Sequence, residues 1–169
     1  HNFYPLTILL LSLLLIVHLL DFNTSLFLIL NHTAQYIPIA WWGYITYMGD
    51  GIAAGCVLAI IFRKNPQVAL IGILAILISG TIVQLLKDFF SISRPAGILD
   101  LNQFYQFGEV FTSRSFPSGH SSTAFSLFGT LIYTQKNKKN GLFLGLAFLI
   151  AFSRIAIGMH WQMDILSGA

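Results

Sequence analysis

The chain alternates long apolar runs with shorter polar stretches, and this pattern predicts membrane-spanning helices. Five complete apolar runs cover residues 3–20, 41–62, 67–86, 118–134 and 141–158, and a sixth begins near Trp161. Each complete run is close to the roughly 20 residues that a helix needs to cross a bilayer. Residues 21–39 are predicted to form an interfacial connector that is partly helical, and residues 87–117 a long irregular segment.

The composition agrees with this interpretation. Hydrophobic residues make up 56% of the 169 residues and charged residues only 9%, against about 25% in a typical soluble domain. A soluble domain of this size has no interior that could bury so many apolar runs. We therefore predict an all-α fold in a single domain over residues 1–169. It would be a polytopic membrane helical bundle of about six transmembrane helices, with the sixth truncated.

The distribution of charge predicts how the bundle is oriented. Five of the nine basic residues lie in the two short loops after the second and fourth runs: Arg63, Lys64, Lys136, Lys138 and Lys139. Loops rich in Lys and Arg are usually cytoplasmic, so both termini are predicted to be cytoplasmic. The other four basic residues then lie at or near the outer face: Lys87, Arg94, Arg114 and Arg154. Because the six acidic residues also lie toward that face, candidate chemistry concentrates there.

Lys87 and Arg94 form the first candidate cluster, in the stretch KDFFSISRP. On a continuous helix, residues seven apart lie two turns apart on nearly the same face. Two cations placed in this way at a membrane surface suit a phosphate or another anion. The pair is equally compatible with interfacial side chains whose charged ends reach the water.

The second cluster is SRSFPSGH, residues 113–120, directly before the fourth apolar run. Pro117 and Ser118 are helix start signals, and Gly119 lets the backbone approach a ligand closely. Free N–H groups at a helix N-terminus form an anion site, and His120 could give a proton to a leaving group. An ordinary capped helix with an interfacial histidine is the alternative interpretation.

The third cluster is SRIAIGMHWQMD, in which His160 and Asp164 are four residues apart. They share a helix face if the sixth helix has begun by then. A carboxylate on one imidazole nitrogen leaves the other free to act as a base or nucleophile. Arg154 offers a planar fork for phosphate oxygens. A His–Asp pair that only closes a helix turn is the alternative.

Taken together, the three clusters resemble the three-part signature of the type-2 phosphatidic-acid phosphatase superfamily. The matching patterns are K-x6-R-P from Lys87, P-S-G-H from Pro117 and S-R-x5-H-x3-D from Ser153, in the same order and spacing. The resemblance covers residues 87–164, and the first 86 residues add only the number of predicted spans. The superfamily also includes soluble acid phosphatases and vanadium haloperoxidases, but five or six membrane spans favour its lipid phosphate phosphatase branch.

The resemblance implies a role for each matching residue. The catalytic residues would be His160, which attacks phosphorus to form a phosphohistidine, Asp164, which orients it, and His120, which protonates the leaving oxygen. The residues that would hold the phosphate oxygens are Lys87, Arg94, Ser118, Gly119 and Arg154. Cations and backbone amides would then stabilise the charge of phosphoryl transfer, so no metal and no other cofactor is expected.

Some residues outside the signature also invite an interpretation. Arg114 is predicted to contact the site from behind or to touch a lipid headgroup. Asp50 is predicted to cap a helix or to form a hydrogen bond within the second span near the site, with a structural role favoured. His18 and His32 are interpreted as structural. Residues 96–115 carry several aromatic side chains, which could shape lipid entry or pack against the bundle.

These observations predict a metal-independent lipid phosphate phosphatase of a bacterial cytoplasmic membrane, with its site at the outer, periplasmic face. The expected substrates are a membrane lipid phosphate or diphosphate, such as phosphatidylglycerol phosphate, undecaprenyl diphosphate or lipid A 1-phosphate. Neither nucleic acid nor an obligate protein partner is expected. The alternatives are a lipid-to-lipid phosphotransferase and a non-catalytic protein that binds or transports lipid phosphates. The candidate nucleophile and its orienting carboxylate argue against a mere binder.

Overall fold

The computed structural model describes residues 23–135 and 140–169, and every regular element in these ranges is helical. The predicted first span, His18 and the loop residues 136–139 lie outside the described residues. The elements are α2 (Asn23–Ala34), α3 (Ile39–Tyr47), α4 (Gly51–Phe62), α5 (Pro66–Phe90), the 3-10 turn η1 (Pro95–Gly97), α6 (Gly119–Gln135), α7 (Asn140–Ala156) and α8 (Gln162–Ser167). The predicted all-α class is therefore confirmed for the described part of the chain.

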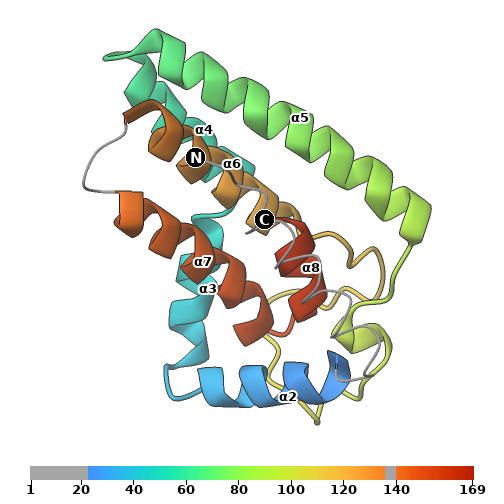
Figure 1. Cartoon of the computed structure of the whole chain (residues 1–169). Coiled ribbons are helices and arrows are strands. Elements are labelled where there is room, and N and C mark those ends of the chain that lie inside the picture. The colour runs from blue at the N-terminus through green and yellow to red at the C-terminus, as the bar shows by residue number, and fades with distance from the viewer. Residues whose placement is uncertain (1–22, 136–139) are drawn as a thin grey trace.

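The longest of these helices, α5, lies along one side of the molecule (Figure 1). It begins where Asn65 accepts a hydrogen bond from the backbone N–H of Val68 at 3.3 Å, and a proline occupies its first turn. It ends at Ser91, whose left-handed φ of 47° stops the helix. The helix therefore continues beyond the predicted end at residue 86, and the irregular segment begins only after Phe90.

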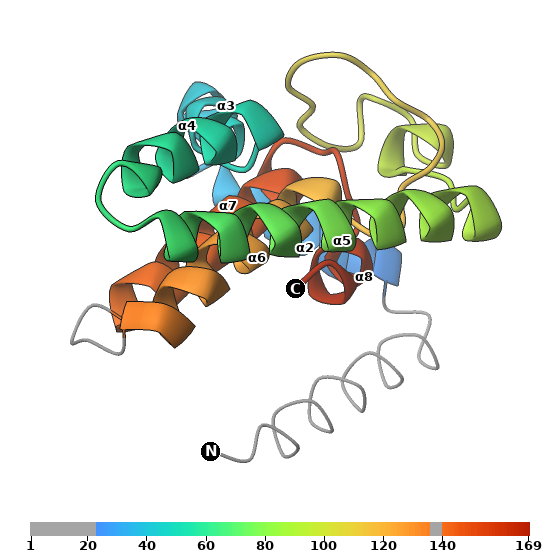
Figure 2. The same ribbon diagram turned by 90° about the horizontal axis from the view of Figure 1, so that it is seen from above.

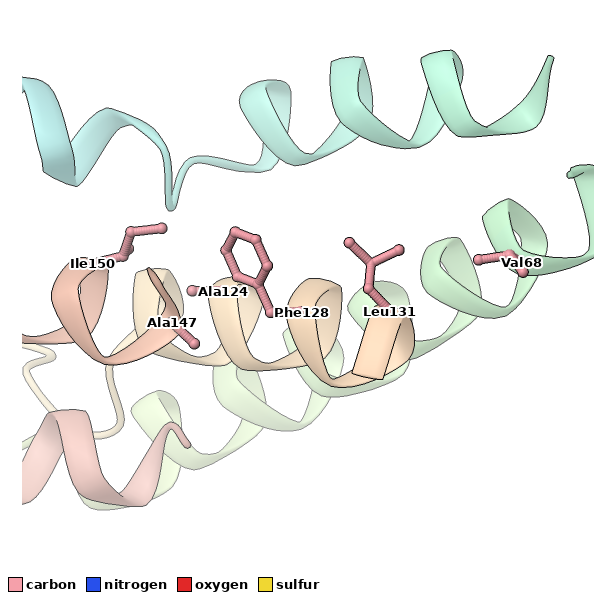
Figure 3. Packing of buried hydrophobic residues seen from close by; sticks show 6 residues of the cluster. All are labelled: Val68, Ala124, Phe128, Leu131, Ala147 and Ile150. Atoms are coloured by element: carbon pink, nitrogen blue, oxygen red, sulfur yellow. The ribbon is translucent and has the colours of Figure 1, made fainter. Parts of the chain in front are cut away.

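The apolar core lies where α6 packs between α5 and α7. Figure 3 shows Ala124, Phe128 and Leu131 of α6 in a row between Ile150 of α7 and Val68 of α5. Each of these side chains is at most 9% exposed. A small residue such as Ala124 lets neighbouring helices approach closely, which favours packing within a membrane. This core fixes the position of the α6 N-terminus relative to the α7 C-terminus.

The predicted second span, residues 41–62, is a bent pair of helices rather than one continuous helix. α3 and α4 meet at an angle of 51°. Asp50 starts the second helix of the pair, because its carboxylate accepts a hydrogen bond from the N–H of Ile52 at 2.8 Å. The predicted capping role of Asp50 is thus present, and it marks the break that the apolar pattern alone concealed.

The connector before this pair contains α2, which lies across the C-terminal end of α7 (Figure 1). Asn31 of α2 is fully buried and its amide donates to the carbonyls of Ile155 and Ala156 at 2.9 and 3.2 Å. It also exchanges hydrogen bonds with the backbone of Tyr105. The partly helical connector that the sequence predicts therefore anchors both the end of α7 and the long loop before α6.

Within residues 23–135 and 140–169, fewer helices meet the length and composition of a membrane span than the sequence predicts. The six-span topology and the cytoplasmic termini therefore stay predictions. Among the described residues, the stretch Pro66–Gly97 is long and apolar enough to cross a bilayer, and the bent pair α3–α4 meets the same criteria if it counts as one span. α6 and α7 have 17 residues each, about 26 Å of helix, which is slightly less than the roughly 30 Å hydrocarbon core. α6 also carries several serines and threonines, which lower its hydropathy.

The cap at Asp50 leads to a stability prediction. Asp50→Ala removes the acceptor for the first turn of α4, and we expect it to lower the free energy of unfolding by about 1 kcal/mol. Asp50→Asn keeps a side-chain oxygen in the same place and is expected to be nearly neutral. Thermal unfolding of the purified protein in detergent measures both. An equal loss in the two variants would show that the charge of Asp50, and not its cap, stabilises the fold.

Candidate active site

His160 lies in the turn between α7 and α8, and Asp164 lies on α8. The sixth helix has not begun at His160, so the two residues do not share a helix face as the spacing suggested. They pair because Asp164 folds back over the start of α8. Its Oδ2 accepts from the backbone N–H of Trp161 at 2.9 Å and lies 3.2 Å from Nδ1 of His160. Both side chains of the pair are at most 2% exposed.

Ser115 joins this pair, although the sequence patterns did not single it out. It is fully buried, and its hydroxyl donates to Oδ2 of Asp164 and lies 3.5 Å from Nδ1 of His160. Its backbone N–H donates to the carbonyl of Ile92 at 2.8 Å. The sequence offers one signal for Ser115, its position within SRSFPSGH. That signal is weak because the same stretch contains two other serines.

Lys87 and Arg94 reach the same site from two different conformations rather than from one helix face. Lys87 lies in the last turn of α5, whereas Arg94 follows the Ser91 turn in extended backbone. Nζ of Lys87 donates to the carbonyl of Arg114 at 2.7 Å, and Nε of Arg94 donates to that of Ser113 at 2.9 Å. The loop before α6 therefore holds both cations through its main-chain oxygens.

Arg94 also contacts the segment that carries His160. Its Nη1 donates to the carbonyl of Met159 at 3.1 Å and lies 3.4 Å from Nε2 of His160. Arg154, in the last turn of α7, is 7% exposed, and its Nη1 donates to the hydroxyl of Thr46 at 2.8 Å. Two guanidinium groups are thus placed beside the histidine by hydrogen bonds to the surrounding chain.

The PSGH stretch provides the start of α6. The N–H of Ser118 donates to the carbonyl of Asp164 at 2.9 Å, which ties α6 to α8 and uses that N–H within the protein. The N–H groups of Gly119 and His120 belong to the first helical turn, whose N–H groups have no partner within the helix. They are therefore the backbone donors best placed for an anion. His120 is partly buried and lies within electrostatic reach of Asp50 and Arg154.

The electrostatics of the site favour a bound anion. Burial and then the nearby charges of Arg154, Arg94 and Lys87 hold the pKa of His160 well below its ordinary value. The imidazole is therefore neutral at pH 7. Among the described residues none of these three cations forms an ion pair with a carboxylate, since the ion pairs there are Arg114–Asp88 and His160–Asp164. Positive charges without matching carboxylates suit a phosphate group.

Within residues 23–135 and 140–169, no group of three or more His, Cys, Asp or Glu side chains is arranged to hold a metal ion. Around His160, one carboxylate, that of Asp164, faces the three cations Lys87, Arg94 and Arg154. This excess of positive charge disfavours a divalent metal ion.

Arg114 takes a position different from the other basic residues. Its half-exposed side chain forms an ion pair with Asp88 at 2.7 Å and donates to Gln84 at 3.2 Å, both on the exposed face of α5. Its contact with the candidate site is made by the main-chain carbonyl that accepts from Lys87. The main chain of Arg114 thus holds Lys87 in place. A supporting role of the Arg114 side chain behind the site and its contact with a lipid headgroup both remain predictions.

The aromatic residues of the loop before α6 divide into two groups. Phe104 is buried and packs edge-on against Phe27 with ring centroids 5.5 Å apart, and Phe107 packs against the core near Trp42. Tyr105 and Phe111 are about half exposed. The guanidinium carbon of Arg94 lies 5.3 Å from the ring centroid of Phe111. Packing therefore explains the first group. In the second group, Phe111 lies at the surface beside Arg94, and Tyr105 packs edge-on against the ring of His32.

Comparison with known proteins identifies the family. The model of the PAP2 superfamily matches residues 68–169, which include every residue of the three-part signature. The chain therefore belongs to the PAP2 superfamily, and the resemblance based on the signature is confirmed.

Two known proteins are similar to this chain over part of their length. The chain is 30% identical over 126 residues to "Bacitracin transport permease protein BcrC" of Bacillus licheniformis, covering 73% of this chain and 60% of that protein. It is 25% identical over 111 residues to "Undecaprenyl-diphosphatase" of Sulfolobus acidocaldarius, covering 66% of this chain and 53% of that protein. The chain thus spans between about half and three fifths of the length of these two relatives.

Two solved structures resemble the fold. LpxE of Aquifex aeolicus superimposes with a TM-score of 0.80 at 29% identity, covering 87% of each chain. A transmembrane PAP2-type phosphatidylglycerolphosphate phosphatase of Bacillus subtilis superimposes with a TM-score of 0.70 at 24% identity, covering 99% of this chain and 89% of that one. The second likeness concerns the fold alone.

Proposed function

We propose that this protein is an integral-membrane lipid phosphate phosphatase that works through a phosphohistidine at His160. One observation carries the proposal. A buried, neutral imidazole has Asp164 at its Nδ1 and Arg94 near its Nε2. It lies among cations that form no ion pair with a carboxylate of the described residues. This arrangement provides a nucleophile, its orienting group and a binding site for phosphate oxygens in one place.

The first chemical step forms a covalent intermediate. Asp164 accepts a hydrogen bond from the Nδ1–H of His160, which leaves the lone pair of Nε2 free to attack phosphorus. Ser115 and the Trp161 N–H hold the carboxylate of Asp164 in place. As the N–P bond forms, the bond from phosphorus to the lipid oxygen breaks. His120, which takes up a proton when the negative charge of the phosphate enters the site, gives that proton to the leaving oxygen.

The second step releases phosphate. His120, now without its proton, takes one from a water molecule, and the oxygen of that water attacks phosphorus. The N–P bond breaks and its electron pair returns to Nε2 of His160. The cations Lys87, Arg94 and Arg154, together with the hydroxyl of Ser118 and the N–H of Gly119, would bind the phosphoryl oxygens in both steps. No metal takes part in this scheme.

The exposed surface supports a lipid substrate. Large apolar side chains are exposed on α3 and at the end of α5, including Trp41 (61% exposed), Tyr44 (67%) and Phe89 (81%). Tyr and Trp are common where a protein meets the membrane–water interface. A relative named as an undecaprenyl-diphosphatase also supports a lipid phosphate or diphosphate. By the loop charges, the site would face the outside of a bacterial cytoplasmic membrane.

The proposal predicts phosphate release from lipid phosphates in detergent with a chelator present. Suitable substrates are phosphatidylglycerol phosphate, undecaprenyl diphosphate and lipid A 1-phosphate, and at least one should be hydrolysed. His160→Ala should lower the rate by about a thousandfold or more, because the nucleophile is gone. His32→Ala is the matched control, since His32 is exposed and its ring contacts the carbonyl of Gln103.

Full activity of His160→Ala would exclude this nucleophile, and complete loss of wild-type activity in chelator would exclude the metal-free scheme. Movement of labelled phosphate to a second lipid with little free phosphate would identify a phosphotransferase instead. Tight binding of the lipids without any release would identify a binding protein.

The role of His120 predicts a dependence on the leaving group. His120→Ala should slow hydrolysis of a lipid phosphate, whose alkoxide leaves poorly, by about a hundredfold or more. An activated aryl phosphate leaves without a proton and should be affected much less in that step. Single-turnover rates for both substrates measure the difference. Equal losses for the two would contradict the assignment of His120 as general acid.

A further inference from the structure

The bend between α3 and α4 packs directly against the candidate site, although it lies outside the residues matched by the family model. At Gly49, an added Cβ would lie 2.6 Å from Ile150 and 3.2 Å from the Cβ of His120. Trp42 packs edge-on against Phe152 of α7, with ring centroids 5.4 Å apart. α3 therefore packs against the C-terminal half of α7, which carries Arg154. Both ribbon views place α3 next to α7 (Figures 1 and 2).

Thr46, in the last turn of α3, makes the polar contact across this interface. It is 5% exposed, and its hydroxyl oxygen accepts a hydrogen bond from Nη1 of Arg154 at 2.8 Å. Burial of both groups strengthens this hydrogen bond relative to one in water. The two residues are 108 positions apart in the sequence, so only the fold brings them together.

The hydrogen bond to Thr46 also sets the orientation of Nε of Arg154. Nε of Arg154 is buried and has no hydrogen-bond partner among the described residues. A buried donor without a partner costs about 1–3 kcal/mol, and more when it is charged. An anion oxygen beside Nε would satisfy it. Because the guanidinium is planar and rigid, fixing Nη1 on Thr46 also fixes the direction in which Nε donates.

We infer that Thr46 is a positioning residue of the phosphate site, which sets the orientation of Arg154 before the substrate arrives. This inference rests on the proposed function, in which Arg154 binds a phosphoryl oxygen. Without the hydroxyl of Thr46, the long arginine side chain would have to be ordered by the substrate itself, and phosphate affinity would fall. Thr46 would not touch the substrate; it would act through Arg154.

The test compares Thr46→Val, which keeps the shape and removes the hydroxyl, with Thr46→Ser, which keeps the hydroxyl. Orthovanadate is the probe, because it mimics a transferring phosphoryl group and its binding can be measured without turnover. Calorimetry on the full chain in detergent should show about tenfold weaker vanadate binding for Thr46→Val, the effect of losing one hydrogen bond to a charged group. Thr46→Ser should stay within about threefold of the wild type.

A second measurement separates positioning from packing. In an Arg154→Ala background, Thr46→Val should no longer change vanadate affinity, because the residue through which it acts is absent. A further loss of similar size in that background would overturn the inference. So would wild-type affinity in Thr46→Val, or equal losses in the Val and Ser variants. If Thr46→Val does not fold, failure of Thr46→Ser to bind vanadate would overturn it in the same way.

The wild type distinguishes this inference from the proposal on which it rests. A wild type that binds vanadate and releases phosphate, together with an unaffected Thr46→Val, would reject only the role of Thr46. A wild type that neither binds vanadate nor releases phosphate from any of the three lipids would reject the proposed function, and the role of Thr46 with it.

Discussion

The gathering of positive charge around a buried histidine is the constraint on which the rest of the structure depends. Lys87 and Arg154 are buried, Arg94 is partly buried, and among the described residues none of the three pairs with a carboxylate. Burying even one charge costs several kcal/mol when nothing compensates it. The protein therefore has to hold these groups in place against their repulsion, and a bound phosphate group would supply the missing negative charge.

The fold meets this constraint with neutral acceptors rather than with carboxylates. Lys87 is held by a main-chain oxygen of the loop before α6, and Arg94 by oxygens of that loop and of the turn that carries His160. Arg154 is held by the hydroxyl of Thr46. Neutral acceptors fix the direction of each cation without neutralising it. The positive charge of these three side chains therefore remains available to a bound anion. An ion pair with a carboxylate would have neutralised it.

The same constraint explains the unusual backbone near the site. The left-handed turn at Ser91 ends α5 and lets Arg94 reach the turn that carries His160. The bend between α3 and α4 brings Thr46 to Arg154 and Gly49 to His120. Both features interrupt elements that would otherwise be long regular helices. The turn and the bend are explained by the contacts that they allow with the residues of the site.

The sequence alone predicted the helical class, and its three-part signature indicated the family, because each signature residue has a distinctive chemistry at a fixed spacing. It could not predict how Lys87 and Arg94 reach the same site, since the Ser91 turn leaves no signal in an apolar pattern. It also missed Ser115 and Thr46, because a hydroxyl residue acquires its role only from a partner far away in the chain. The bend at Asp50 was also hidden from the sequence analysis. One aspartate within an apolar run can cap a new helix or lie inside a continuous one, and the apolar pattern is the same in both cases.

The central claim is that His160 becomes covalently phosphorylated, and trapping this intermediate tests it most directly. The full chain is mixed with a lipid substrate labelled in its terminal phosphate, quenched in alkali within a single turnover, digested, and analysed by mass spectrometry. The account predicts a phosphate on His160 that survives alkali, is lost in acid, and is absent from His160→Ala. Phosphate on a different residue, or turnover with no label on the protein at any time, would contradict it.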